Sequence, residues 1–117
     1  MLPLCEAVER LALGSLPPRA VALTFDDGYA SVVETAWPLL RKRDMPATLF
    51  VCSEYLPGTQ RFDWDTTEPV HERHRVATAE QIVDAHAEGL DIGSHTRTHP
   101  WLPALDDEAL AHELLES

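Results

Sequence analysis

Short apolar runs alternate along the chain with longer stretches in which apolar residues recur at helical spacing. Proline or glycine borders each apolar run, and the runs occupy residues 20–25, 47–52 and 90–95. Runs of this length and composition are typical of strands buried inside a sheet. The stretches with helical spacing predict helices at residues 6–13, 32–44, 79–88 and 106–117.

Two capping motifs support the helix boundaries. Glu34 comes three residues after Ser31, and Gln81 comes three residues after Thr78, which is the spacing of a capping box. Both middle helices are therefore expected to begin at these polar residues. Pro38 has no backbone N–H and should kink the helix that contains it.

Residues 53–77 form the longest stretch without a clean period. They combine aromatic residues, prolines and a concentration of charge, so we expect a long excursion loop. Phe62 and Trp64 in this stretch, and Trp101 beyond it, are expected to anchor the core or the loops.

The alternation of strand and helix predicts the α/β class, with three βα units of a parallel sheet joined by right-handed crossovers. In such sheets the functional site lies at the carboxyl ends of the strands. Asp26 and Asp27 follow the first predicted strand, and the segment GSHTRTHP at 93–100 spans the end of the third. We therefore expect these two segments to meet on one edge of the sheet.

Composition and charge narrow the class of protein. The 117 residues are 44% apolar and 25% charged, as in an ordinary globular domain, and the formal net charge of −11 argues against nucleic acid and anionic lipid as partners. No apolar run approaches the roughly 20 residues that span a bilayer. The first residues lack the basic region of a secretory signal, so a cytoplasmic location is the default expectation. Cys5 and Cys52 are too few for a disulfide framework.

Two histidines offer an explanation for the adjacent aspartates. Adjacent carboxylates repel each other, which calls for a compensating group nearby. His95 and His99 are four residues apart, so a single turn could aim both imidazoles at one point. With one carboxylate they would offer two nitrogens and one oxygen to a divalent cation, zinc being the expected ion, and leave a position for water. The other carboxylate would be free to accept a proton.

The segments that carry these residues resemble a known family. TFDDG and SHTRTH are similar, in this order, to the first two motifs of the polysaccharide deacetylases, the NodB-homology group also called carbohydrate esterase family 4. The resemblance implies that Asp26 is the general base and that Asp27, His95 and His99 bind the metal.

Other positions of the two motifs are expected to support the site. Tyr29, two residues after Asp27, is a candidate substrate-binding residue, with packing as the alternative. The structural supports that the resemblance implies are Thr24, Phe25, Gly28, Ser94 and Thr96.

The resemblance also implies a distorted (β/α) barrel of about twice this length, since full barrels typically need about 250 residues. Residues 1–117 would then be a partial NodB-like domain without the C-terminal motifs, which supply an arginine, groove aromatics and a general acid. His112 lies on the last predicted helix and is not expected to be that acid, and we assign His71, His74 and His86 to solvent or loop. Open sheet edges are expected to pair with another copy in a homo-oligomer.

The expected reaction is metal-dependent hydrolysis of an N-acetyl amide, or less often an O-acetyl ester, on a carbohydrate. Two alternatives stay open at this point. The same site could open a small cyclic amide, as in allantoinase-like relatives of the superfamily. The chain could instead be a metal-binding or assembly module without catalytic activity.

Overall fold

The sheet is parallel and its strands follow chain order. The computed structural model describes residues 1–58, 61–65 and 74–117. Within these residues the sheet has three strands in the order β1, β2, β3, with bounds Thr24–Phe25, Thr48–Val51 and Asp91–Ser94. The predicted α/β class and parallel connectivity are confirmed, and the predicted second and third strands are each found to within one residue at either end.

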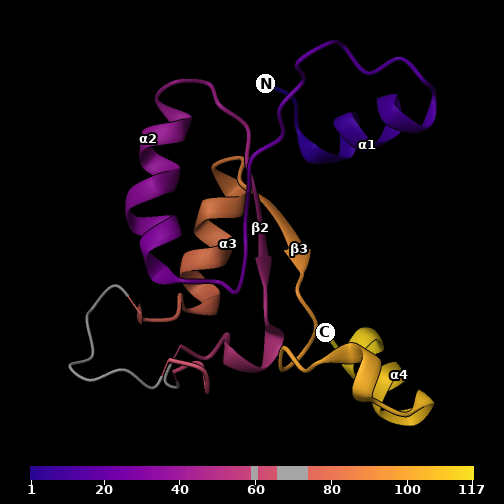
Figure 1. Ribbon diagram of the computed structural model, residues 1–117. Coiled ribbons are helices and arrows are strands. Elements are labelled where there is room, and N and C mark those ends of the chain that lie inside the picture. The colour runs from indigo at the N-terminus through magenta and orange to yellow at the C-terminus, as the bar shows by residue number, and fades with distance from the viewer. Residues whose placement is uncertain (59–60, 66–73) are drawn as a thin grey trace.

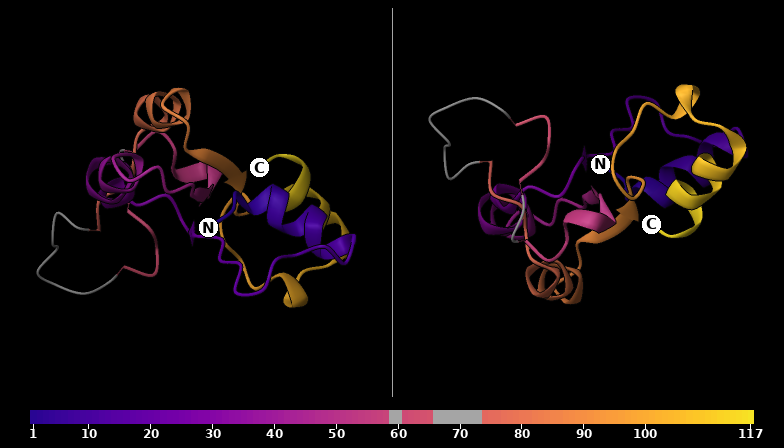
Figure 2. Two further views of the ribbon diagram at one scale, coloured as in Figure 1. Left: turned by 90° about the horizontal axis from the view of Figure 1, so that it is seen from above. Right: turned by 90° about the horizontal axis from the view of Figure 1, so that it is seen from below.

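The helices flank this sheet on two sides. Helices α2 (Trp37–Arg41) and α3 (Ala79–Ala87) lie on one side, and α1 (Leu4–Ala12) and α4 (Asp107–Leu115) lie on the other (Figure 1 and Figure 2). Helix α4 is near the carboxyl ends of the strands, whereas α1 is near their amino ends (Figure 1). None of the described helices is long and apolar enough to cross a membrane.

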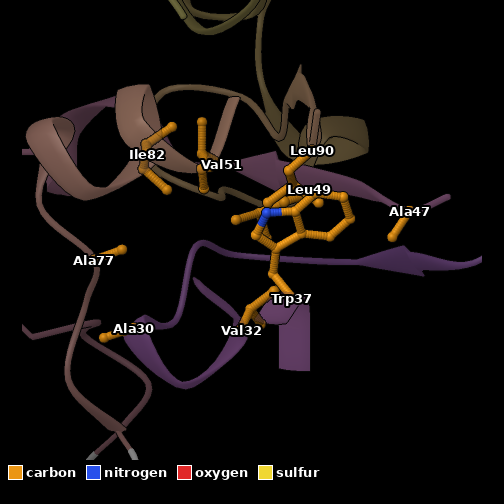
Figure 3. Packing of buried hydrophobic residues seen from close by; sticks show 10 residues of the cluster. Ala30, Val32, Trp37, Ala47, Leu49, Val51, Ala77, Ile82 and Leu90 are labelled. Carbon is orange, nitrogen blue, oxygen red and sulfur yellow. The ribbon is translucent and has the colours of Figure 1, made fainter. Parts of the chain in front are cut away.

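The main core lies between the sheet and the helices α2 and α3. Trp37 from α2, Leu49 from β2 and Leu90 before β3 belong to one buried cluster (Figure 3). Fully burying a side chain of this size contributes about 1.5–3 kcal/mol. A second cluster, under the excursion loop, is formed by Cys52, Tyr55, Phe62 and Val76. These contacts hold the strands in place and so determine where the strand ends point.

The first strand differs from the prediction. A buried strand over 20–25 is wrong in both length and burial, because β1 has only two residues, Thr24 is exposed and Val21 is 53% exposed. Among the described residues β1 pairs only with β2, through the two residue pairs Thr24–Thr48 and Phe25–Leu49, so the preceding residues stay outside the ladder. The outer edges of β1 and β3 are open in this part of the chain, and their pairing with another copy stays a prediction.

The helix at 32–44 is found in part. It begins as a π-helical turn, Val32–Ala36, and continues as α2, so Pro38 lies where the winding changes. The predicted capping box at its start is wrong, because Ser31 makes no side-chain capping hydrogen bond. The Glu34 carboxylate instead accepts hydrogen bonds from Arg75 and Gln81, which tie this helix to the start of α3.

The excursion loop is described only in part. Its described portions contain a 3-10 turn at Ser53–Tyr55 and an isolated antiparallel bridge between Tyr29 and Val76. Residues 59–60 and 66–73 of the predicted loop lie outside the described residues.

Replacement of Thr78 by alanine is expected to lower the free energy of unfolding by about 1 kcal/mol. The capping box predicted there is confirmed: Thr78 Oγ1 accepts the Gln81 N–H at 3.2 Å, and Gln81 Oε1 accepts the Thr78 N–H at 3.0 Å. Ser31→Ala is the matched control and should be nearly neutral, since Ser31 makes no such bond. Urea denaturation of both variants measures the difference, and equal losses would contradict the assignment.

Candidate metal centre

The aspartate pair lies in a tight turn at the carboxyl end of β1. Asp27 has φ of 73° and Gly28 has φ of 104°, so the chain reverses immediately after the strand. A positive φ is uncommon for a residue with a side chain and costs of order 1–3 kcal/mol. The turn is held because the Asp27 carbonyl accepts the N–H of Cys52, just past β2, at 3.2 Å. This turn leaves Asp26 exposed and Asp27 partly buried.

Glycine is favoured beside Asp27 by the backbone conformation. The φ of Gly28 is one that residues with a side chain rarely adopt, and the position lies close to β2, since a Cβ here would be in contact with Val51 Cγ1 at 3.4 Å. The turn therefore packs directly on β2. This close approach places the Asp27 side chain next to the neighbouring strand ends.

The two histidines lie in a second strained turn, at the carboxyl end of β3. The N–H of His95 donates to the Val51 carbonyl at 2.8 Å, which continues the pairing with β2. Thr96 and His99 then have φ of 67° and 63°. Side-chain hydroxyls support the turn: Ser94 Oγ accepts the N–H of Thr96 at 3.2 Å, and Thr96 Oγ1 accepts the N–H of His99 at 3.0 Å.

The two turns bring three potential ligands together. His95 Nε2 lies 3.4 Å and His99 Nε2 lies 3.7 Å from the same oxygen, Asp27 Oδ1. One ligand atom from each of the three residues lies within 4.8 Å of the others. A tetrahedral zinc with bonds of about 2.0–2.2 Å keeps its ligand atoms about 3.3–3.6 Å apart. The two distances to Asp27 Oδ1 are therefore close to those of a three-ligand metal site, and the set as a whole lies within 4.8 Å.

Backbone strain supports a functional role for this cluster. Asp27 and His99, two of the three potential ligands, have positive φ, and so does Thr96 between the histidines. Strained residues persist only where the surrounding structure holds them, and they gather at functional sites. Sequence reasoning had located the three residues on one edge but carried no signal for this strain.

An aromatic side chain borders the cluster. The Trp64 ring lies 4.7 Å from the His99 ring, centroid to centroid, and stacks on Phe62 at 4.6 Å. Phe62 is buried, as expected of an anchor, whereas Trp64 remains 38% exposed. Trp64 was expected only to anchor the core or the loop, and its contact with His99 has no counterpart in the sequence pattern. Trp101, expected to be an anchor as well, is 76% exposed.

Tyr29 is engaged in the same region. Its hydroxyl donates to Asp65 Oδ2 at 3.0 Å and accepts the Trp64 Nε1–H at 3.3 Å. Burial, together with the Asp65 carboxylate, raises the pKa of Tyr29 to about 12, so the phenol stays neutral near pH 7. Tyr29 thus holds the segment that carries Trp64, and substrate binding by Tyr29 itself remains a prediction.

Cys52 lies next to the site, but its thiol is not in a reactive form at neutral pH. Its thiol is buried, its Sγ lies 3.5 Å from the His95 carbonyl, and Cys5 is the other free cysteine. Burial, with Asp27 nearby, raises the pKa of Cys52 to about 12, so the thiolate is scarcely populated at neutral pH. Both observations agree with a packing role.

The other histidines that the structure describes are outside the cluster. His74 Nδ1 lies 4.0 Å from Asp65 Oδ1, and His86 Nδ1 lies 2.9 Å from the Leu90 carbonyl. His112 pairs with Glu116 on the exposed side of α4. His71 is not among the described residues.

Fold and site together define an α/β protein with a candidate three-ligand metal centre at the carboxyl edge of a parallel sheet. The chain belongs to the polysaccharide deacetylase family, whose profile matches residues 14–117. The resemblance seen in the two sequence motifs is thereby confirmed.

Individual proteins show how much of the family's length is present. The chain is 30% identical over 99 residues to YxkH of Bacillus subtilis, a candidate polysaccharide deacetylase, and the match covers 85% of this chain and 30% of YxkH. The Streptococcus pyogenes deacetylase PplD, solved with acetate, matches with a TM-score of 0.76 and 25% identity over 99% of this chain and 46% of PplD. The chitin deacetylase of Colletotrichum lindemuthianum matches with a TM-score of 0.56 and 26% identity over 81% of this chain and 36% of that protein. The chain thus corresponds to part of a (β/α) barrel and spans less than half of each relative.

Proposed function

We propose that this chain carries the metal-binding part of a hydrolase that removes acetyl groups from N-acetylated, or less often O-acetylated, carbohydrate. The observation that carries the proposal is the convergence of Asp27, His95 and His99 at the carboxyl edge of the sheet. Membership of the polysaccharide deacetylase family supports the reaction class. Because the chain spans less than half of its relatives, we propose that the complete groove needs further strands, as a partial NodB-like domain would.

The donor set suits zinc. Two imidazole nitrogens and one carboxylate oxygen are ligands that catalytic zinc commonly takes, with one position left for water. Other first-row ions accept the same donors, so zinc and cobalt are both suitable for testing the site. The three side chains are 20% to 43% exposed, which leaves the site open to solvent on one side.

Asp26 and Asp27 would divide the chemistry between them. A bound zinc would supply an acidified water and would polarise the acetyl carbonyl oxygen. Asp26 is exposed and, within the described residues, its carboxylate has no hydrogen bond or ion pair, so it is available to accept the proton of that water. The turn at Asp27 directs the two side chains to different environments, partly buried and exposed.

Trp64 gives the proposed site an apolar side. An exposed aromatic ring next to a metal ligand can contact the C–H face of a sugar, and Trp64 is held in place by Phe62 and by the Tyr29 hydroxyl. The names of the similar proteins support an acetylated substrate: PplD was solved with acetate, and the Colletotrichum lindemuthianum protein is a chitin deacetylase. We therefore propose an N-acetylated sugar as the group that lies between Trp64 and the cluster.

Acetate release is the direct test. A protein that combines residues 1–117 with the further strands of the groove, loaded with zinc or cobalt, is expected to release acetate from N-acetylated chito-oligomers. Removal of the ion with a chelator is expected to stop the release. A cyclic ureide serves as the competing substrate, and its hydrolysis in place of acetate release would favour the cyclic-amide alternative. For this longer protein, metal binding without hydrolysis of either compound would contradict catalysis and favour a metal-binding module, whereas an inactive chain of residues 1–117 alone would fit both explanations.

A further inference from the structure

Glu113 on α4 is the one charged side chain that is buried among the described residues. It is 7% exposed, although the rest of α4 carries its charges on the surface. A buried carboxylate is costly unless hydrogen bonds compensate it. The hydrogen-bond partners of Glu113 therefore indicate the role of this side chain.

The hydrogen-bond partners of Glu113 among the described residues lie between the two histidines of the candidate site. Glu113 Oε2 accepts the backbone N–H groups of Arg97 and Thr98 at 3.0 and 2.8 Å. Glu113 Oε1 accepts the Thr98 hydroxyl at 2.7 Å. One carboxylate thus binds the middle of the His95–His99 turn through three hydrogen bonds.

This turn needs such support because it is strained at two places. Thr96 and His99 both have positive φ, which is costly for residues with a side chain and persists only where the surrounding structure offsets the cost. The Thr96 hydroxyl holds the N–H of His99, but Arg97 and Thr98 between them direct their N–H groups outward from the sheet, toward α4. Without Glu113 these two donors would be left to water.

The carboxylate is also in the charge state that this role requires. Burial alone would raise its pKa, but the hydrogen bonds from Thr98 and Arg97 prevail and lower the pKa of Glu113 below its usual value. Glu113 is therefore ionised at neutral pH and can act as an acceptor through both oxygens.

We propose that Glu113 is a positioning residue of the metal centre, which holds the 96–99 turn in the geometry that aims His95 and His99 at one ion. This inference rests on the proposed metal site. The competing explanation is that Glu113 only attaches α4 to the sheet, in which case the metal affinity would not depend on it beyond the effect on folding.

Cobalt binding by the Glu113→Gln variant distinguishes the two explanations. Glutamine keeps the size of the side chain but removes the negative charge and replaces one acceptor oxygen with an –NH2 donor. The charge-assisted hydrogen bonds from Arg97 and Thr98 are therefore weakened, and the Thr98 hydroxyl and the two N–H groups can no longer donate to separate oxygens. Residues that orient metal ligands typically change metal affinity by about 10–100-fold, and we expect a loss near tenfold in calorimetry together with a changed visible spectrum of bound Co²⁺. Glu116→Gln is the matched control, because Glu116 lies on the exposed side beyond α4, and it should bind cobalt like the wild type.

Each outcome has a defined meaning. If wild type and Glu113→Gln bind cobalt with equal affinity and the same spectrum, the positioning role is wrong. If the wild type binds no cobalt, the proposed metal site fails instead. If Glu113→Gln loses its far-UV circular dichroism, Thr98→Val decides, since it removes only the hydroxyl hydrogen bond; a folded Thr98→Val variant with wild-type cobalt affinity and spectrum would overturn the proposal.

Discussion

Replacement of Asp27 by alanine is expected to abolish stoichiometric binding of zinc or cobalt. Asp27 Oδ1 lies 3.4 Å from His95 Nε2 and 3.7 Å from His99 Nε2, so its removal leaves two imidazoles and no anionic ligand. Two imidazoles alone do not form the three-ligand site of a catalytic zinc. Isothermal titration calorimetry of metal-free protein measures the effect, with one equivalent expected for the wild type.

A second variant separates loss of a ligand from loss of the turn. Asp27 has positive φ, so alanine there also adds backbone strain, whereas His95 is not among the residues with positive φ. His95→Ala should therefore lose metal binding without that strain, and Asp26→Asn should retain it. Binding of one equivalent by both Asp27→Ala and His95→Ala would refute the ligand assignment.

Replacement of Asp26 by asparagine is expected to reduce acetate release by about 10²–10⁴-fold while metal binding persists. Asparagine has nearly the same shape but cannot accept the proton of the attacking water. The rate is measured as acetate released from N-acetylated chito-oligomers by metal-loaded protein. Calorimetry on the same variant supplies the control, and the exposed position of Asp26 makes a folding defect unexpected.

Two outcomes for the Asp26→Asn variant would contradict this prediction. A metal-loaded Asp26→Asn variant with the wild-type rate would show that another group accepts the proton. A variant that loses both activity and metal would instead assign Asp26 to the ligand set, in contradiction to the role that the family resemblance implies.

The parallel topology is the reason why sequence reasoning located the candidate site. Apolar runs at 47–52 and 90–95 predicted β2 and β3 closely, and Thr78 with Gln81 predicted the start of α3, because in each case short-range rules agree with the tertiary contacts. Parallel strands then place residues that follow them on one edge, which brought Asp27 to the two histidines.

Other features depend on contacts that local patterns do not encode. The expected capping box at Ser31 is absent because Glu34 pairs with Arg75 and Gln81, far away in the sequence. Strand β1 is short and partly exposed because its pairing with β2 covers only two residues, although its composition is that of a buried strand. The approach of Trp64 to His99 joins an aperiodic loop to a strand end and leaves no periodic signal.

The arrangement of the three strands has a mechanical consequence. β1 and β3 never touch each other in the sheet, since β2 separates them, yet Asp27 follows the first and both histidines follow the last. An ion bound by these side chains would link the two outer strands, β1 and β3, across β2. In an unfolded chain these three groups would be far apart and would bind the ion poorly. Part of the binding free energy would therefore raise the free energy of unfolding. This link would act on β1, which has only two residues and therefore pairs with β2 over a shorter length than β3 does.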